Sequence, residues 1–387
     1  MEKRIQVNLN YIRPNSSLIY PLYDKNGENV LKERTILSSE RLAKIKVKYG
    51  TVLFCDEQTD RAVVPNYRLN IALHQSRDLM EEISTTGKLS KSSFRGLEQV
   101  VDEMVSDLMS SDIELLRLIK EMKSEDEYLY CHAVNVGLLA GAFAKNIGCK
   151  SGDIKQITLG GFLIDIGHMM QDRQYLDKKS SFSTDERHKM MRHPQLGYEV
   201  LKQIPGIHPM VLQAVLFHHE RFNDSGYFHM PYAKLPETPK IVAVCDMYDA
   251  FTTDRPYRDG MTPEKALRVL LNSIDIHFDQ YLIGSFINRV GAQVNHAQSF
   301  YGTNEICELN TQELALVREI GAHDLLKPKV LVFCRFEKAA GKLNVKFFDK
   351  PLEVDLEDDD RFMAKMVDNP DHLKLVRKKL IQRGIIA

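Results

Sequence analysis

The stretch MVLQAVLFHHE, residues 210–220, places two adjacent histidines, His218 and His219, directly after an apolar helical run. Neighbouring residues on a helix point about 100° apart, so both imidazoles reach one centre only where that centre lies over a helix end or between helices. A buried imidazole needs a polar partner, and a metal ion is a natural partner for two of them. The stretch therefore predicts a mostly helical fold that holds a metal site.

Further residues of the kind that bind metals recur on both sides of this pair. Consecutive candidates are separated by about one helix plus one connection, so each is expected on a different helix of one bundle. Mixed His and carboxylate ligands favour Fe or Mn over a structural zinc site, with one or two divalent ions bound. Asp165 could bridge two metals, and paired metals promote in-line displacement at phosphorus. The predicted ligands are His132, Asp165, His193, His218, His219 and Asp246.

Composition places these helices in a globular protein large enough for more than one domain. The chain has 387 residues, of which 43% are hydrophobic and 27% charged. Lys plus Arg is 52 and Asp plus Glu is 53, which argues against binding to a nucleic-acid polymer or a membrane surface. The sequence shows scattered cysteines, no signal peptide and no apolar run of membrane-spanning length, so a cytoplasmic protein without a membrane span is predicted.

The N-terminal part divides into two predicted segments. Residues 1–66 combine short strands with one helix, SSERLAKIKVKYG, that starts at a Ser cap and stops at Gly50, which predicts an α+β regulatory or docking module. Residues 67–122 show apolar residues at three- and four-residue spacing and are predicted to be a helical connector. Ordinary core packing explains that spacing, and contact between two copies in a homodimer is the alternative.

The rest of the chain also divides into two predicted segments. Residues 123–297 are mostly helical and contain the candidate ligands. Residues 298–387 return to strand patterns and are predicted to form a β-rich extension with two terminal helices, DRFMAKMVDN and DHLKLVRKKLIQRGIIA.

The segment that carries the ligands resembles the HD-GYP branch of the HD phosphohydrolase superfamily. The likeness covers about residues 123–297, under half of the chain, and its last two stretches are long and specific. The C-terminal β segment also resembles an extension often found after this domain. The matching stretches are YLYCHAVNV at 128–136, IDIG at 164–167, RHPQLG at 192–197, HHER at 218–221 with GY at 226–227, and AVCDMYDA at 243–250 running into TDRPYR at 253–258.

The resemblance implies a bacterial signal-transduction enzyme, a metal-dependent phosphodiesterase that hydrolyses cyclic di-GMP. It implies that the metals, with Asp165 as a catalytic residue, activate a water that attacks phosphorus. Arg255 and Arg258 match positions that contact the phosphates, and paired guanidinium groups suit a dianionic cyclic dinucleotide. Tyr227, in the Gly-Tyr loop, is expected to contact the substrate.

The chain departs from the family pattern at three positions. The His of the defining His-Asp doublet is Ile164, which cannot bind a metal, while His168 replaces a Lys and Phe228 replaces a Pro. If the helix continues through Gly167, His168 lies four residues after Ile164 on the same face. There it could replace the missing ligand or act as a catalytic residue that transfers a proton to the leaving group. The alternative is a drifted residue in a decaying site.

Three functions stay open at this point. The first is a working cyclic di-GMP phosphodiesterase with a modified metal site. The second is a pseudo-enzyme that binds the nucleotide or a protein partner in second-messenger signalling, and Ile164 favours it. The third is an HD phosphohydrolase that acts on another nucleotide. The other candidate ligands favour the first function, because a site released from selection would lose several ligands and not one.

Overall fold

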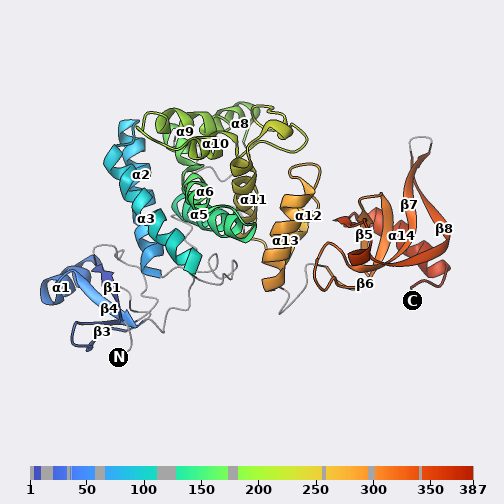
Figure 1. The fold of residues 1–387 in the computed structure, drawn as a ribbon, viewed down its shortest axis with the longest axis horizontal. Helices are drawn as coiled ribbons and strands as arrows, with labels where there is room; N and C mark the ends of the chain where they lie inside the picture. Colours follow the sequence, from blue (N-terminus) through green and yellow to red (C-terminus); the bar gives the residue numbers. More distant parts are fainter. Residues whose placement is uncertain are drawn as a thin grey trace. The chain divides into compact units, whose positions relative to one another are not determined.

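The computed structural model describes residues 4–9, 21–32, 35, 37–56, 66–110, 128–172, 182–254, 259–294, 301–339 and 342–386. Its elements form two compact units, Met1–Leu216 and Phe217–Ala387, and most of them are helices (Figure 1). A small sheet lies toward each end of the chain, so the predicted mostly helical fold with flanking β-containing segments is confirmed. Among the described residues, no helix has the length and apolar character needed to cross a membrane. The exact boundaries of the four predicted segments stay a prediction.

The described residues of the N-terminal part of the first unit form a small antiparallel sheet and the helix α1. Ser38 caps α1 by accepting a hydrogen bond from the Arg41 amide, and Gly50 ends it with a φ of 80° that favours glycine. Both ends of this helix were predicted from the sequence. The strand order is β1-β4-β2-β3. The elements are β1 (Arg4–Asn8), β2 (Leu22–Tyr23), β3 (Asn29–Leu31), α1 (Ser39–Tyr49) and β4 (Val52–Asp56).

The other described elements of the first unit are helices, and α5 is the most buried of them. Every residue of α5 from Cys131 to Ala144 is buried. Helices α5 and α6 lie side by side, and a Cβ added to Gly161 of α6 would lie 2.8 Å from the Gly137 Cα of α5 (Figure 1). This glycine contact lets the two backbones approach closely. The elements are α2 (Asn66–Thr86), α3 (Lys91–Ser110), α5 (Tyr128–Asn146), α6 (Ser151–Leu163), η4 (Ile166–Met170), α8 (Thr184–Met190), α9 (His193–Leu201) and α10 (Pro209–Phe217).

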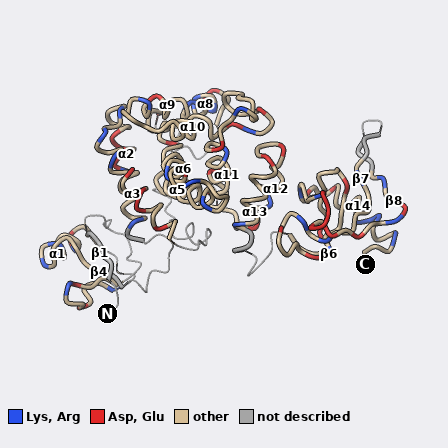
Figure 2. The backbone as a smooth tube through the Cα atoms, viewed as in Figure 1, with Lys and Arg blue, Asp and Glu red and all other residues tan. Residues whose placement is uncertain are grey.

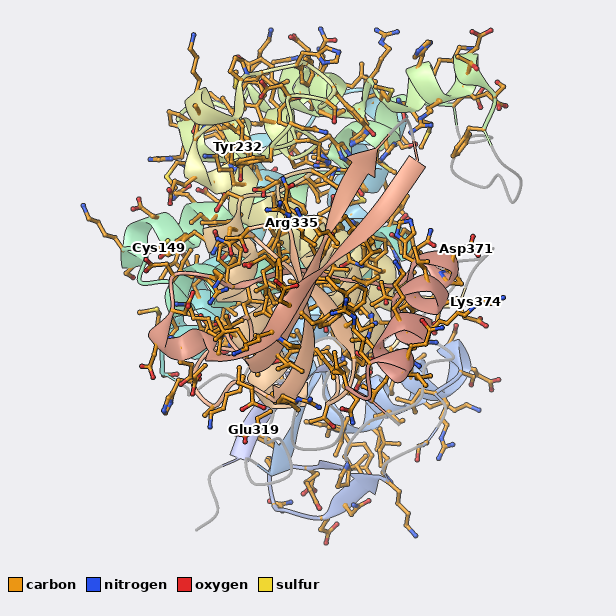
Figure 3. The ribbon with its side chains drawn as sticks, turned by 90° about the vertical axis from the view of Figure 1, so that its right-hand side faces the viewer. Cys149, Tyr232, Glu319, Arg335, Asp371 and Lys374 are labelled. Atoms are coloured by element: carbon orange, nitrogen blue, oxygen red, sulfur yellow. The ribbon has the colours of Figure 1, made fainter. Side chains whose placement is uncertain are left out.

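The second unit combines helices with a five-stranded antiparallel sheet of order β8-β7-β6-β5-β9. Helix α14 packs on this sheet through Val376 and Leu380, which share a core with Phe333 of β7. Figure 3 shows Asp371 and Lys374 on α14 and Arg335 on β7. The elements are η5 (Tyr232–Lys234), α11 (Glu237–Thr252), α12 (Pro263–Leu271), α13 (Gln280–Val294), β5 (Ile306–Leu309), β6 (Glu313–Glu319), β7 (Lys329–Ala339), β8 (Lys342–Asp355), η6 (Leu356–Asp358), β9 (Met363–Met366) and α14 (Pro370–Gln382).

The prediction of two terminal helices is wrong for the first of them. The segment DRFMAKMVDN contains strand β9, which pairs antiparallel with β5 and buries Met363 and Met366. The free edge of β5 offers backbone hydrogen-bonding groups that a strand satisfies and a helix does not, so pairing overrides the local pattern. The second terminal helix is confirmed as α14.

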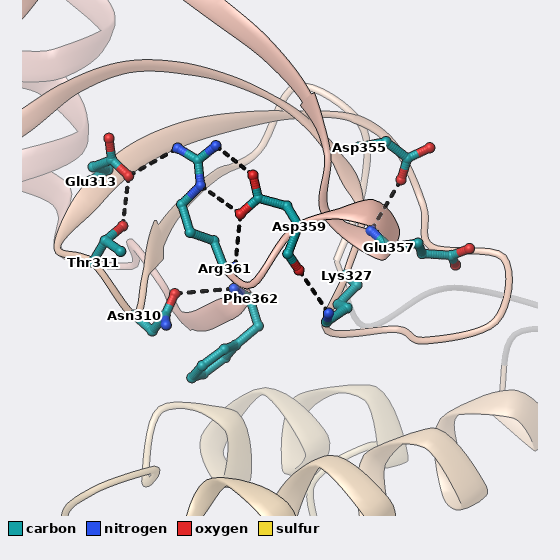
Figure 4. Close-up of polar contacts among 9 residues, drawn as sticks. All are labelled: Asn310, Thr311, Glu313, Lys327, Asp355, Glu357, Asp359, Arg361 and Phe362. Atoms are coloured by element: carbon teal, nitrogen blue, oxygen red, sulfur yellow. Dashed lines mark hydrogen bonds and ion pairs between the residues drawn. The ribbon is translucent and has the colours of Figure 1, made fainter.

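An arginine fixes the turn that leads into β9. The guanidinium of Arg361 donates to both carboxylate oxygens of Asp359, at 2.9 and 2.8 Å, and to Glu313 of β6 at 3.2 Å (Figure 4). The hydrogen bonds from Arg361 lower the pKa of Asp359 to about 2. The pair of Asp359 and Arg361 therefore stays ionised at all ordinary pH values and holds this turn on β6.

Charged residues of both signs are interspersed along the described chain, as Figure 2 shows. Within the second unit, one such group joins the helices to the sheet. Arg268 of α12 donates from its Nε to both oxygens of Asp368, at 2.9 and 3.0 Å, and from one terminal nitrogen to Glu305 at 2.9 Å. Asn272, one turn further on, binds the Asp368 carboxylate and accepts a hydrogen bond from the Met366 amide of β9. We call Arg268, Asn272, Glu305 and Asp368 the α12 latch.

Replacing Arg268 by Met is expected to destabilise the second unit by about 1–2 kcal/mol, since the latch is partly exposed to solvent. The hydrogen bonds from Arg268 lower the pKa of Asp368, so this stabilisation is complete above the ordinary Asp pKa and is lost as the pH falls below it. Urea unfolding at pH 7 and at about pH 3 measures both effects. Arg377→Met, on an exposed part of α14, is the control. Equal losses in the two variants would contradict a specific role for the latch.

Candidate metal centre and signature loop

Asp165 lies two residues after the end of α6 and directly before η4, a tighter helical turn. Helix α6 ends at Leu163, and η4 is a 3-10 helix, so the condition that the helix continues through Gly167 is not met. Within η4, a Cβ added at Gly167 would lie 1.9 Å from the backbone oxygen of His193. The backbone of η4 therefore touches the start of α9, beside the place where Asp165 and His193 lie together.

Three imidazoles surround Asp165 within the first unit. His132 comes from α5, His168 from η4 and His193 from the first position of α9, and all three are buried. The Nε2 atoms of His168 and His193 lie 3.6 and 3.5 Å from Oδ1 of Asp165. The Nε2 atom of His132 lies 3.4 Å from Oδ2. Three of the predicted metal ligands and His168 are thus in one place.

These distances suit residues that share a cation. They are longer than ordinary N–H···O hydrogen bonds. Two ligand atoms about 2.1 Å from one ion at tetrahedral angles lie about 3.4 Å apart. The ligand atoms of Asp165, His168 and His193 all lie within 4.8 Å of one another. Because the two oxygens of Asp165 face different rings, His132 on one side and His168 with His193 on the other, the carboxylate could bridge two ions.

His193 is held in the tautomer that a metal ligand needs. Its Nδ1 lies 2.8 Å from the backbone oxygen of Met190, which can only accept a hydrogen bond. The proton of the neutral ring is therefore on Nδ1, and the lone pair on Nε2 faces Asp165. Such a hydrogen bond on the far nitrogen is typical of metal-binding histidines.

The second unit contains the other predicted ligands. The rings of His218 and His219 lie 4.1 Å apart, and Tyr227 stacks on His219 at 4.4 Å. Arg221 donates to the backbone oxygen of His218 at 3.1 Å and contacts Nδ1 of His219 at 3.4 Å. Burial lowers the pKa of Arg221, and the charge of Asp246 acts in the opposite direction, so Asp246 on α11 lies near this group. His218, His219, Tyr227 and Asp246 therefore surround or adjoin Arg221.

Glu220 organises the loop that contains Tyr227, a role that the sequence analysis missed. Its side chain is 1% exposed, and its two oxygens accept hydrogen bonds from the amides of Phe228 and Met230, each at 2.8 Å. An added Cβ on Gly226 would lie 2.5 Å from the Glu220 Cα, so the loop returns tightly onto this residue. The sequence feature that could have indicated this role is the position of Glu220, an acidic residue at the end of an apolar run. We call residues 226–230 the signature loop.

Replacing Glu220 by Gln is expected to destabilise the second unit by roughly 1–3 kcal/mol. An amide nitrogen would face one of the two loop amides, donor against donor, and the signature loop would open. Hydrogen exchange at the Phe228 and Met230 amides measures this opening, with Glu353→Gln on exposed β8 as the control. Unchanged exchange in Glu220→Gln would show that the loop is held by other contacts.

Two predicted substrate-binding residues, Arg255 and Arg258, lie outside the described residues. The structure therefore brings together His132, Asp165, His168 and His193 in one unit, and His218, His219, Tyr227 and Asp246 in the other. The ligand and catalytic roles of these residues stay predictions.

Comparison with known proteins adds a family match and several relatives. Residues 114–282 match a family model described as an HD domain. A protein of Pseudomonas aeruginosa named cyclic di-GMP phosphodiesterase PA4108 is 32% identical over 60% of this chain and 54% of its own length. The cyclic di-GMP phosphodiesterase response regulator RpfG of Xanthomonas campestris pv. campestris is 29% identical over 45% of this chain and 47% of its own. A 3'3'-cGAMP-specific phosphodiesterase 1 of Vibrio cholerae is 25% identical over 39% of this chain and 35% of its own.

A solved structure shares the fold. Bd1817, a HDG"Y"P protein from Bdellovibrio bacteriovorus, superposes with a TM-score of 0.51 at 16% identity, covering 73% of this chain and 98% of that one. The chain spans about half the length of the two cyclic di-GMP phosphodiesterases named above.

Proposed function

We propose, from the premise that residues 114–282 form an HD domain, that this protein is a metal-dependent phosphodiesterase that hydrolyses cyclic di-GMP. One observation carries the proposal: the Nε2 atoms of His132, His168 and His193 all face the Asp165 carboxylate although Ile164 replaces the first residue of the doublet. Relatives named cyclic di-GMP phosphodiesterases support the choice of substrate.

The proposed roles follow the donor chemistry of the residues. Asp165, His132 and His193 would hold divalent ions, Fe or Mn, and His218, His219 and Asp246 would complete the ligand set, because the HD match extends over both groups. Bound metal would supply an activated water for attack on phosphorus. In this proposal Arg255 and Arg258 bind the phosphates, and Tyr227 contacts a nucleotide base from the signature loop.

The other parts of the chain are proposed to regulate this domain. Residues 1–66 would receive an input or dock a protein partner, and residues 67–122 would connect them to the HD domain, with a homodimer contact as a further role. We place the protein in the cytoplasm, where a second-messenger nucleotide is available.

A second function, nucleotide binding without hydrolysis, is favoured by Ile164. Its side chain is fully buried and apolar at the position where the doublet requires a histidine, so that ligand is lost. A different cyclic dinucleotide as substrate is the third candidate, because relatives named 3'3'-cGAMP-specific phosphodiesterases also match.

The test is hydrolysis by the full chain, purified without chelators or air and supplied with Mn or Fe, with Asp165→Ala as the blank. Linear or mononucleotide product from cyclic di-GMP above the blank would support the proposal. Product from 3'3'-cGAMP but not from cyclic di-GMP would show that the substrate is 3'3'-cGAMP and support the third candidate. Tight binding of cyclic di-GMP without product would overturn hydrolysis and identify a binding module, and neither binding nor product would overturn both.

A further inference from the structure

We infer that His168 is a metal ligand that replaces the one lost at Ile164, and that Gln171 is the positioning residue that makes His168 a ligand. The inference rests on the metal dependence of the proposed function and adds to it a ligand set of this chain's own, Asp165, His168 and His193. Four features carry it: the position of the His168 ring, the orientation of the Gln171 amide, the tautomer that this orientation requires, and an anchor that Gln171 and His193 share.

The His168 ring lies against the other ligands and not toward solvent. Its side chain is buried, and its ring stacks on that of His193 at 4.0 Å with an angle of 21° between the planes. The two Nε2 atoms approach the same oxygen of Asp165, at 3.6 and 3.5 Å. The 3-10 turn of η4 produces this geometry, because His168 is three residues after Asp165 and three residues complete one 3-10 turn.

The Gln171 amide has only one orientation that satisfies its neighbours. Its Nε2 lies 2.5 Å from the backbone oxygen of Lys189 and 3.5 Å from that of Met190, and backbone oxygens can only accept. The nitrogen must therefore face these two carbonyls. The amide oxygen, which can only accept, then faces Nδ1 of His168 at 2.8 Å.

This orientation determines the tautomer of His168. Since the Gln171 oxygen accepts, the proton of the neutral ring is on Nδ1, and Nε2 presents a lone pair toward Asp165. A lone pair binds a metal, whereas it cannot give a proton to a leaving group. The hydrogen bonds therefore favour the ligand role over the proton-transfer role that the sequence left open.

The same short segment orients both rings. Backbone carbonyls at the end of α8 accept hydrogen bonds from the Gln171 amide, whose oxygen accepts from His168. The Met190 carbonyl also accepts a hydrogen bond from Nδ1 of His193. The last carbonyls of a helix lack the amide four residues further on that interior carbonyls bind, so they can accept hydrogen bonds from side chains. Two imidazoles fixed in one tautomer by one anchor, and aimed at one carboxylate oxygen, constitute a prepared cation site.

The test is Co²⁺ binding by the full chain, measured as affinity and as the visible spectrum of the bound ion, without reference to activity. His168→Gln is expected to weaken binding by tenfold or more and to change the spectrum, because an imidazole leaves the coordination sphere. Gln171→Met, similar in size but without the acceptor oxygen, is expected to weaken binding by about 10–100-fold. His188→Gln, on the exposed surface of α8, should match the wild type.

A rescue variant separates ligation from a structural role. Ile164→His in the His168→Gln background is expected to restore affinity, since it returns an imidazole to the doublet. In metal-free protein, ¹⁵N chemical shifts should show the proton of His168 on Nδ1, and Gln171→Met should remove that preference.

The possible results distinguish this inference from the proposed function. Wild-type affinity and spectrum in His168→Gln would overturn the inference, and hydrolysis by that variant would leave the proposed function intact. Failure of the wild-type chain to bind Co²⁺, Mn²⁺ or Fe²⁺ would overturn both. If the ¹⁵N chemical shifts show the proton of His168 on Nε2, the role assigned to Gln171 is overturned.

Discussion

Replacing Asp165 by Ala is expected to reduce bound metal to about a tenth of the wild-type content or less and to abolish the proposed hydrolysis of cyclic di-GMP. The reason is the shared position of this carboxylate, whose two oxygens face the Nε2 atoms of three buried histidines. Its removal takes away the negative charge and the group that could bridge two ions. The three imidazoles that remain around this position supply neither a negative charge nor a bridging oxygen, so the remaining ligands hold a divalent ion less tightly.

Metal content after gel filtration, by elemental analysis, checks this expectation. The control is Asp172→Ala, which removes an exposed carboxylate from the same stretch of chain. Metal retained in Asp165→Ala would place the binding site elsewhere and would leave the convergence of the three rings without a function.

Local sequence patterns predicted much of the fold. The Ser cap and the terminal glycine located α1 because a helix end is determined by its own residues, Ser38 and Gly50. Strand β9 escaped prediction because it depends on the unpaired edge of β5, which is distant in sequence. The match of residues 114–282 to the HD domain confirms the resemblance that the short stretches around the ligands indicated.

The candidate site was predictable in its residue types and less so in its geometry. His168 was considered as a replacement ligand on the condition that the helix continued from Ile164 through Gly167. Helix α6 ends before that point, and His168 lies near Asp165 through a 3-10 turn instead. Gln171 and Glu220 were missed, since each acts through backbone groups of segments that only the fold brings near. Hydrogen bonds to backbone leave little trace in one sequence.

Replacing Gly167 by Ala is expected to cause a large loss of both stability and metal affinity. An added Cβ would lie 1.9 Å from the His193 oxygen and 2.5 Å from the Gly197 amide nitrogen, which are backbone atoms that cannot rotate away. Helix α9 must therefore move off η4, and His193 moves with it, away from Asp165. Overpacking costs about 1–3 kcal/mol where side chains can yield, so a backbone clash should cost at least that much.

The matched control is Gly152→Ala in the first turn of α6, where an added Cβ meets nothing within 4 Å. That change should leave metal affinity unchanged and stabilise the protein by up to about 1 kcal/mol, because alanine favours a helix over glycine. Thermal unfolding and Co²⁺ affinity of both variants make the comparison. Weakened metal binding in Gly167→Ala, in protein shown to be folded, would mean that the contact of η4 with α9 sets the distance between Asp165 and His193. Unchanged affinity would mean that the ligands do not depend on this contact, and the close approach at Gly167 would then serve packing alone.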